Sequence, residues 1–176
     1  MFRLDGKYRG NSINALPAAD IKTIEAMMIK QKPFIKAFHE DNGQDLLLKG
    51  EVDVVLEYNG DMAQAMLEDD DIDFLIPKEG SQFNSDNMCI PKGAPHPKNA
   101  HAFINYILDA QVGKEISETI LFPTPNEATK AIMPASYKDS PVIFPPAKDL
   151  ARCEYAKYNP ELQALYEEAF TRIRAS

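Results

Sequence analysis

The chain has 176 residues with 27 acidic and 19 basic side chains, which gives a formal net charge of −8. This length corresponds to one ordinary domain, and fractions of 44% hydrophobic and 26% charged residues exclude disordered, collagen-like and low-complexity classes. The negative charge opposes binding to phosphate backbones, so we expect no nucleic-acid partner. The acidity suits a cationic partner, or it serves only solubility.

The first half of the chain predicts helices that alternate with buried strands. The opening 14 residues are interpreted as a loop or tail. Apolar residues at helical spacing then predict helices over residues 17–32, 44–49 and 62–67. Short apolar runs predict strands over residues 34–38, 51–58 and 72–77. The run 51–58 is β-branched with charges at its ends, which is typical of a strand covered on both faces.

The second half continues the alternation. Residues 87–91 predict a further strand, and Cys89 within it is expected to pack as a small hydrophobic residue. Helices are predicted over residues 97–108, 112–120, 126–133 and 160–173. The last of these begins with Asn159 as its cap and Pro160 at its first position. Strands alternating with helices indicate an α/β fold, in which ligands bind at loops after the carboxyl ends of strands.

The sequence contains no arrangement typical of catalysis or metal binding. His96 and His101 are five residues apart, which does not place both on one face of a helix. The acidic run 68–71 lacks the glycine and the final glutamate of a calcium-binding loop. We therefore expect no enzyme, no cofactor and no metal site. Residues 1–7 lack the apolar core of a secretory signal, so we expect a cytoplasmic chain or a piece of a longer one.

Aromatic and acidic residues gather near several predicted loops. An aromatic face attracts a cation by about 0.5–2 kcal/mol, and a carboxylate adds a charge-assisted hydrogen bond. Together these side chains suit an organic ammonium group, whereas for any single ring packing in the core is the competing interpretation. The residues are Tyr58, Asp61, Phe83, Asp86, Phe122, Glu154 and Tyr155.

Seven short motifs follow one another along the chain. They are Leu48–Asp53, Glu57–Asp61, Ile76–Gly80, Asp86–Pro91, Asn99–Asn105, Pro123–Asn126 and Leu165–Glu168. In this order and at this spacing they resemble the periplasmic spermidine/putrescine-binding proteins of ABC transporters. The resemblance runs from about Asn11 to the end of the chain.

This resemblance implies a two-lobed α/β fold of the type II periplasmic-binding-protein kind, which closes on its ligand like a hinge. Members are about twice as long, so the chain resembles their C-terminal half, with a mixed sheet flanked by helices. By this analogy residues 1–84 and 151–176 belong to the second lobe. Residues 85–150 cross the hinge and contribute to the first lobe. The resemblance also implies a periplasmic location.

The resemblance implies ligand-binding roles for five residues. Asp86 matches the family's amine-binding aspartate. Tyr58 falls where the family has an aromatic residue, usually Trp, against the polyamine methylenes. Phe122 replaces a Tyr, and Tyr155 matches an aromatic residue. Asn84 stands where the family has a Trp that sandwiches the ligand, so one wall of the slot is lost.

Two functional hypotheses follow from this resemblance. In the first, the chain is the solute-binding component of an ABC importer. It captures putrescine, spermidine or a related cation and delivers it to the permease, although the isolated half is expected to bind weakly or not at all. In the second, it is an interaction or oligomerising module that has lost ligand binding. Such a module would cover the surfaces exposed by the missing N-terminal half, for example by homo-dimerisation.

Overall fold

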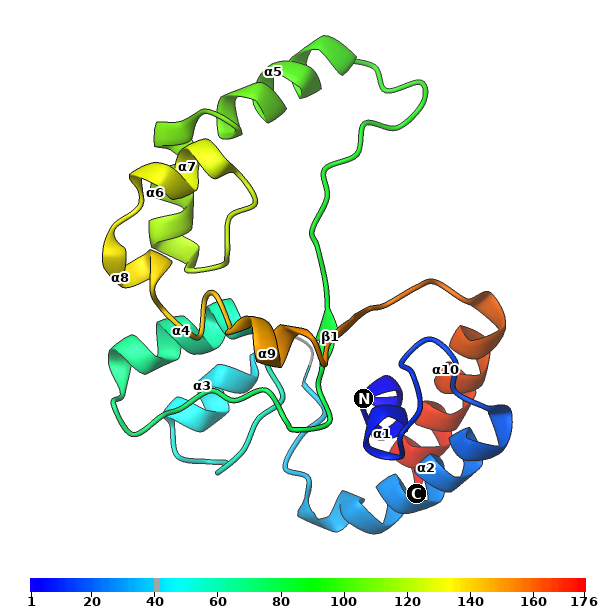
Figure 1. Cartoon of the computed structure of the whole chain (residues 1–176). Coiled ribbons are helices and arrows are strands. Elements are labelled where there is room, and N and C mark those ends of the chain that lie inside the picture. Colours follow the sequence, from blue (N-terminus) through cyan, green and yellow to red (C-terminus); the bar gives the residue numbers. More distant parts are fainter. Residues whose placement is uncertain (40–41) are drawn as a thin grey trace. The chain divides into compact units, whose positions relative to one another are not determined.

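The computed structural model describes residues 1–39 and 42–176. Its secondary structure is mostly helical, and the only sheet among these residues has two parallel strands (Figure 1). The described chain divides into two compact units. Unit 1 comprises residues 1–39, 76–84 and 147–176, and unit 2 comprises residues 42–75 and 85–146. No helix in the described ranges is long and apolar enough to cross a membrane.

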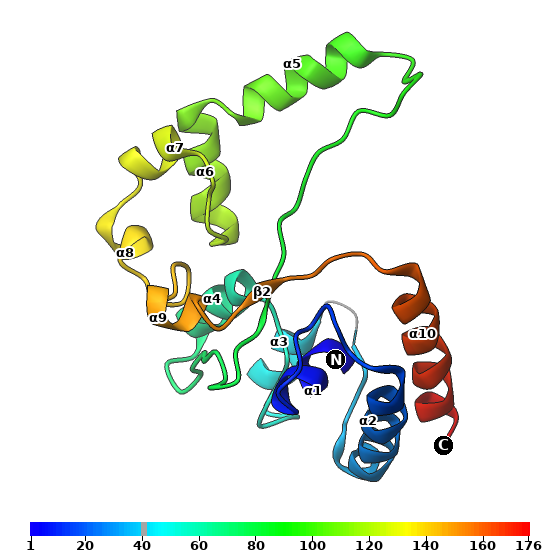
Figure 2. The same ribbon diagram turned by 45° about the vertical axis from the view of Figure 1, so that its right-hand side comes forward.

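Unit 1 is built around two helices that lie side by side, α2 (Ala18–Gln31) and α10 (Pro160–Ala175) (Figure 2). Helix α1 (Phe2–Tyr8) packs with them, whereas the sequence predicted a loop or tail there. A tertiary contact explains this difference, because the Phe2 ring is buried and stacks on Tyr166 with a centroid distance of 5.3 Å. Other members of this core are Leu16, Ile21, Ile24, Met28, Ala169 and Ile173.

The start of α10 is fixed by local chemistry, as the sequence predicted. The Asn159 side chain accepts hydrogen bonds from the backbone N–H groups of Glu161 and Leu162, and Pro160 occupies the first helical position. This satisfies two of the backbone donors that a helix leaves unpaired at its N-terminus. The remaining elements of unit 1 are η1 (Lys32–Phe34), α9 (Ala147–Leu150), β1 (Gln82–Phe83) and β2 (Glu154–Tyr155).

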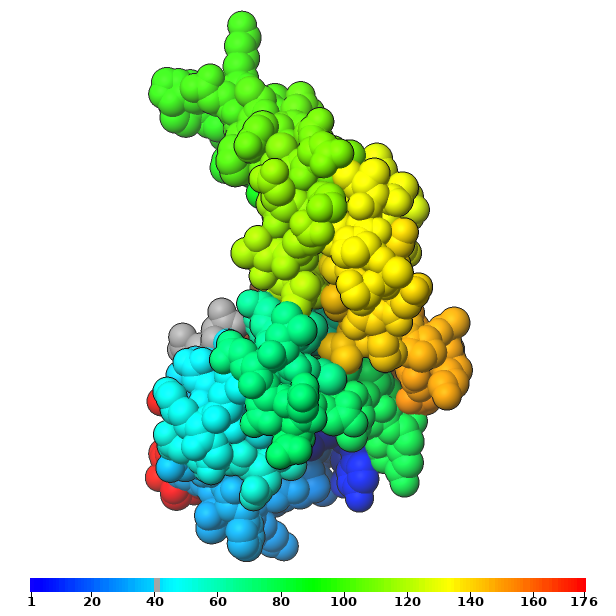
Figure 3. All heavy atoms as spheres, turned by 90° about the vertical axis from the view of Figure 1, so that its left-hand side faces the viewer, coloured from blue at the N-terminus to red at the C-terminus, as the bar shows by residue number. Residues whose placement is uncertain are grey.

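Unit 2 contains six described helices, of which all but the last correspond to predicted ones. They are α3 (Gly43–Leu48), α4 (Asn59–Glu68), α5 (Pro97–Ile107), α6 (Ala110–Ile120), α7 (Glu127–Ile132) and α8 (Ala135–Lys138). Helices α6 and α7 lie against each other, light green and yellow in the space-filling view (Figure 3). Gly113 permits this close approach, because a Cβ there would lie 2.4 Å from Oγ1 of the buried Thr129.

None of the predicted strands forms a strand in the described residues. Residues 51–58, 72–77 and 87–91 belong to no helix or sheet, and residues 34–38 begin in the 3-10 turn η1. Val54 is 85% exposed, so the run 51–58 is not covered on both faces, and Cys89 is exposed rather than packed. A strand exists only beside another strand, and β-branched composition does not supply that neighbour.

The two compact units do not follow the boundaries that the resemblance implied. Residues 42–75 cluster with residues 85–146, and residues 76–84 cluster with the N-terminal helices. The implied lobes at 1–84 with 151–176, and at 85–150, refer to the complete two-lobed fold. That assignment stays a prediction.

Candidate functional site

Two of the predicted ligand-binding residues, Tyr58 and Phe122, come together in unit 2. Tyr58 immediately precedes α4, and Phe122 follows the C-terminal end of α6. Their ring centroids are 6.4 Å apart and the ring planes meet at 50°. Gly60, in the first turn of α4, allows Phe122 to lie there, because a Cβ on Gly60 would be 2.0 Å from Phe122 Cδ2. The result is an aromatic pair of which Tyr58 is about half exposed.

The loop that carries Phe122 is held by the buried side chain of Tyr137. The Tyr137 hydroxyl donates to the backbone oxygen of Phe122 at 2.6 Å and accepts from the backbone N–H of Thr124 at 2.8 Å. Leu121 ends α6 in the left-handed conformation with φ of 56°. Gln64 on α4 donates to the oxygen of Ile120 at 3.1 Å, which joins the two helices beside the pair. These contacts place the Phe122 ring.

A second aromatic pair, Phe83 and Tyr155, lies in unit 1. The parallel strands β1 and β2 place Phe83 opposite Tyr155, with ring centroids 5.2 Å apart and planes at 34°. The predicted residue Asn84 follows Phe83 directly and is exposed. Asn14 fixes β2, because its side-chain nitrogen donates to the oxygen of Tyr155 at 2.8 Å and its side-chain oxygen accepts from Lys157 N–H at 2.7 Å.

Glu154, beside Tyr155, is a carboxylate whose oxygens are already engaged. Lys7 Nζ lies 2.7 Å from one oxygen, and the Ser12 hydroxyl donates to the other. These hydrogen bonds, that of Lys7 first, lower the pKa of the Glu154 carboxyl below its usual range. Glu154 therefore acts as a structural anchor for β2 rather than as a free acceptor for a ligand.

Asp86 presents a carboxylate that the rest of the described chain does not use. It lies in the stretch 85–96, which contains no helix or strand and leads to α5 (Figure 1). Its side chain is exposed, and no hydrogen bond or ion pair joins it to another described residue. An exposed carboxylate without a partner is available to an ammonium group.

The structure thus brings Tyr58 and Phe122 together in unit 2, and Tyr155 and Phe83 together beside Asn84 in unit 1. Sequence reasoning missed Tyr137 as the residue that holds Phe122, and no local pattern marks it. It also included Gly60 only as a member of the motif Glu57–Asp61. The role of Gly60 depends on a ring 62 positions later in the chain.

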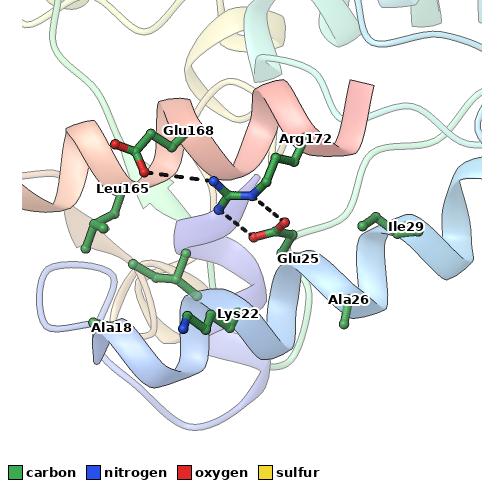
Figure 4. A pocket seen from close by; sticks show the side chains of 9 residues that line it. Ala18, Lys22, Glu25, Ala26, Ile29, Leu165, Glu168 and Arg172 are labelled. Carbon is green, nitrogen blue, oxygen red and sulfur yellow. Dashed lines mark hydrogen bonds and ion pairs between the residues drawn. The ribbon is translucent and has the colours of Figure 1, made fainter. Parts of the chain in front are cut away.

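A separate hollow lies in unit 1 between α2 and α10 (Figure 4). Arg172 spans it, with Nε and Nη2 at 2.7 and 2.8 Å from the two carboxylate oxygens of Glu25, and with Glu168 3.9 Å away. The hydrogen bonds from Arg172 lower the pKa of Glu25. None of the predicted ligand-binding residues lines this hollow. Its lining residues are Ala18, Ile21, Lys22, Glu25, Ala26, Ile29, Leu165, Glu168 and Arg172.

No group of three or more His, Cys, Asp or Glu side chains is placed to hold a metal ion in the part of the chain that the structure describes. The predicted ligand-binding residues present two aromatic pairs, each with one exposed tyrosine, and the exposed carboxylate of Asp86. Such an arrangement favours noncovalent binding of a cation with aliphatic segments.

Comparison with known proteins gives a consistent set of relatives. The spermidine/putrescine-binding periplasmic protein of Escherichia coli is 28% identical over 175 residues, which cover 99% of this chain and 50% of the relative. A putrescine/cadaverine-binding protein of Pseudomonas aeruginosa is 31% identical, with 96% and 49% covered. The chain spans about half the length of the curated relatives that it matches.

Solved structures agree with the predicted fold class. A putative spermidine/putrescine ABC transporter protein from Listeria monocytogenes matches with a TM-score of 0.90 and 25% identity, covering 98% of this chain and 54% of that one. A spermidine/putrescine substrate-binding protein from Streptococcus pneumoniae has the same fold, with a TM-score of 0.77. These matches confirm the resemblance that the seven motifs indicated. The family model for bacterial extracellular solute-binding proteins matches residues 14–145, and the chain belongs to that family.

Proposed function

We propose that this chain is part of the solute-binding component of an ABC importer and that its ligand is a polyamine, putrescine or spermidine, or a related organic cation. The relatives named above for polyamine binding support this proposal. The protein would capture its ligand in the periplasm and pass it to the permease, without making or breaking a bond.

The observation that carries the proposal is the aromatic pair of Tyr58 and Phe122, fixed by Gly60, in which Tyr58 is 48% exposed. Aromatic faces attract an ammonium group and also pack against methylenes, which are the two parts of a polyamine. In this proposal the unused carboxylate of Asp86 pairs with an ammonium group. We also propose ligand-binding roles for Tyr155 and Asn84, which lie in unit 1.

The isolated chain is proposed to bind its ligand weakly or not at all. Because the chain spans about half the length of its relatives, we propose that a share of the ligand contacts comes from residues that it does not span. Affinity falls steeply as contacts are lost, about tenfold for each 1.4 kcal/mol. The proposal therefore predicts a lower ligand affinity for the chain alone than for the chain joined by a complementary half.

Calorimetric titration tests this function. Putrescine and spermidine are titrated into the chain, alone and together with the part of the Listeria relative that the chain does not match. The uncharged analogue 1,4-butanediol serves as the ligand control. We expect heat from both amines in the second sample, little or none in the first, and none from the diol in either, because only the amines carry the charge that Asp86 pairs with.

Matched variants identify the residues that bind. Asp86→Asn is expected to weaken amine binding about tenfold or more, whereas Asp70→Asn, at an exposed turn of the same unit, leaves it unchanged. The matched control for Tyr58→Ala is Tyr158→Ala, because Tyr158 is 82% exposed. Absence of heat and of any thermal shift in both samples would contradict polyamine binding. Equal losses in Asp86→Asn and Asp70→Asn would show only general attraction to an acidic surface.

A further inference from the structure

Helix α1 carries two cationic side chains four residues apart, Arg3 and Lys7. Side chains at this spacing lie on the same face of a helix. Both reach the segment that contains β2, where the residues that they contact lie 154 and 147 positions later in the chain. One face of α1 therefore contacts the segment that carries the predicted ligand-binding residue Tyr155.

Lys7 holds the residue that precedes Tyr155. Its Nζ lies 2.7 Å from a carboxylate oxygen of Glu154, and the Lys7 side chain is only 13% exposed. Gly80 leaves room for the lysine, because a Cβ on Gly80 would lie 2.6 Å from Lys7 Cε. A charge-assisted hydrogen bond is shorter and stronger than a neutral one. The pair thus fixes the start of β2 against α1.

Arg3 holds the residues that follow. Its Nη2 donates to the backbone oxygen of Lys157 at 3.0 Å, and its Nη1 donates to the side-chain oxygen of Asn14 at 3.3 Å. The planar guanidinium presents its donors in a fixed fork, so one arginine binds both acceptors. Asn14 in turn bonds to the backbones of Tyr155 and Lys157. Arg3 therefore fixes the chain after β2 both directly and through Asn14.

Strand β1 fixes the other edge of β2. The backbone N–H of Glu154 donates to the oxygen of Ser81 at 3.1 Å, and the parallel register places Phe83 beside Tyr155. Tyr155 itself is 60% exposed. Because most of this residue faces solvent, the backbone that carries it decides where its ring lies. That backbone is held between β1 on one edge and the contacts from α1 and Asn14 on the other.

We propose that α1 is a positioning element for the ligand site and that Arg3 and Lys7 are its positioning residues. Neither side chain touches the ligand in this proposal, and both act through the backbone on either side of Tyr155. The inference rests on the proposed function, in which Tyr155 binds a polyamine, and it assigns to α1 a share in the ligand affinity. Replacement of either cation is expected to let the Tyr155 ring leave Phe83 and to weaken binding.

A tryptophan placed at position 155 reports where the ring lies without any ligand. The chain contains no tryptophan, so Tyr155→Trp introduces a single indole beside Phe83. In this background we expect Arg3→Met and Lys7→Met to shift the fluorescence emission to longer wavelength and to lower its anisotropy. The physical reason is that an indole that leaves its neighbour is more exposed and more mobile. Lys22→Met removes the same charge from an exposed position on α2 and should change neither quantity.

Exchange of two charges separates a specific contact from general damage. Lys7→Glu is expected to shift the emission as Lys7→Met does, since two carboxylates then face each other. Lys7→Glu combined with Glu154→Lys restores an ion pair with its signs reversed, and the emission should return towards that of Tyr155→Trp alone. Far-UV circular dichroism reports whether each variant folds. Where a methionine variant does not, the double exchange and Arg3→Lys decide, because Arg3→Lys keeps the charge, loses the fork and should also shift the emission.

Calorimetric titration with putrescine tests the effect on the ligand. It uses the mixture of the chain with the unmatched part of the Listeria relative, with tyrosine kept at position 155. Arg3→Met and Lys7→Met should each lower the affinity about three- to tenfold, which corresponds to the loss of one hydrogen bond, and Lys22→Met should not. In the Tyr155→Ala background the same substitutions should cause no further loss, because cations that act through the ring then have nothing to position.

Two results would overturn the inference. One is unchanged emission in both methionine variants. The other is a loss of putrescine affinity that stays as large in the Tyr155→Ala background, since α1 would then act on the site only through general stability. An emission shift without heat from putrescine in any sample, the unaltered chain included, would support the placement of the ring by α1 and contradict only the proposed function.

Discussion

Gly60 is the position at which a single methyl group most directly tests the candidate site. A Cβ there would lie 2.0 Å from Cδ2 and 2.2 Å from Cε2 of Phe122, well inside van der Waals contact. Gly60 does not have a positive φ angle, so its backbone conformation is also accessible to alanine. The substitution Gly60→Ala therefore acts through the ring and not through the backbone.

The expected magnitude is a difference between two opposing effects. Overpacking a fitted contact costs about 1–3 kcal/mol, because the ring or the helix must shift. Replacing glycine by alanine in a helix stabilises it by about 0.5–1 kcal/mol. We expect Gly60→Ala to lower the free energy of unfolding of unit 2 by about 0.5–2 kcal/mol and to move Phe122 away from Tyr58.

A double-mutant cycle with Phe122→Ala isolates the contact. Urea denaturation followed by far-UV circular dichroism gives the free energy of unfolding of the four proteins. With the ring removed, Gly60→Ala should become stabilising, since only the helix propensity remains. The coupling energy between the two sites is then about 1–3 kcal/mol. A coupling energy near zero would refute the reasoning that Gly60 is required by the Phe122 ring.

Three further predictions concern contacts within unit 1 or within unit 2. Tyr137→Phe removes the hydroxyl that Thr124 N–H donates to, and it should destabilise unit 2 by about 1–3 kcal/mol and speed exchange at the Thr124 amide. Asn159→Ala removes the cap of α10 and should cost about 0.5–2 kcal/mol in urea denaturation. Glu154→Gln should make unit 1 less stable at neutral pH, because the lowered pKa of Glu154 reports a charged form held by Lys7. That stabilisation is present above the unfolded pKa, near 4.5, and is lost as the pH falls through the lower folded value, so the difference from the unaltered chain should vanish in acid.

Each of these has an outcome that would contradict it. Unchanged exchange at Thr124 in Tyr137→Phe would mean that the hydroxyl does not hold the loop. A neutral Asn159→Ala would show that α10 is stabilised by packing alone. A stability difference for Glu154→Gln that persists at low pH would indicate a steric effect, since the ion pair with Lys7 no longer exists once Glu154 is protonated.

The order of the seven motifs predicted the family, and the comparisons confirm it. Sequence also predicted seven of the described α-helices, whereas α1, α8 and α9 were not predicted. The cap of α10 by Asn159 and the start of α5 at Pro97 were both expected. Of the candidate site, the sequence named Tyr58 and Phe122, but it did not predict that Gly60 and Tyr137 set their geometry.

Helices were predicted better than strands for a physical reason. A helix forms its hydrogen bonds between residues four apart, so spacing and capping along the chain are enough to determine it. A strand takes its hydrogen bonds from another segment, and the runs 51–58 and 72–77 have the composition of strands but belong to no sheet among the described residues. Contacts between distant residues, such as Gly60 with Phe122, were decided only by the tertiary structure.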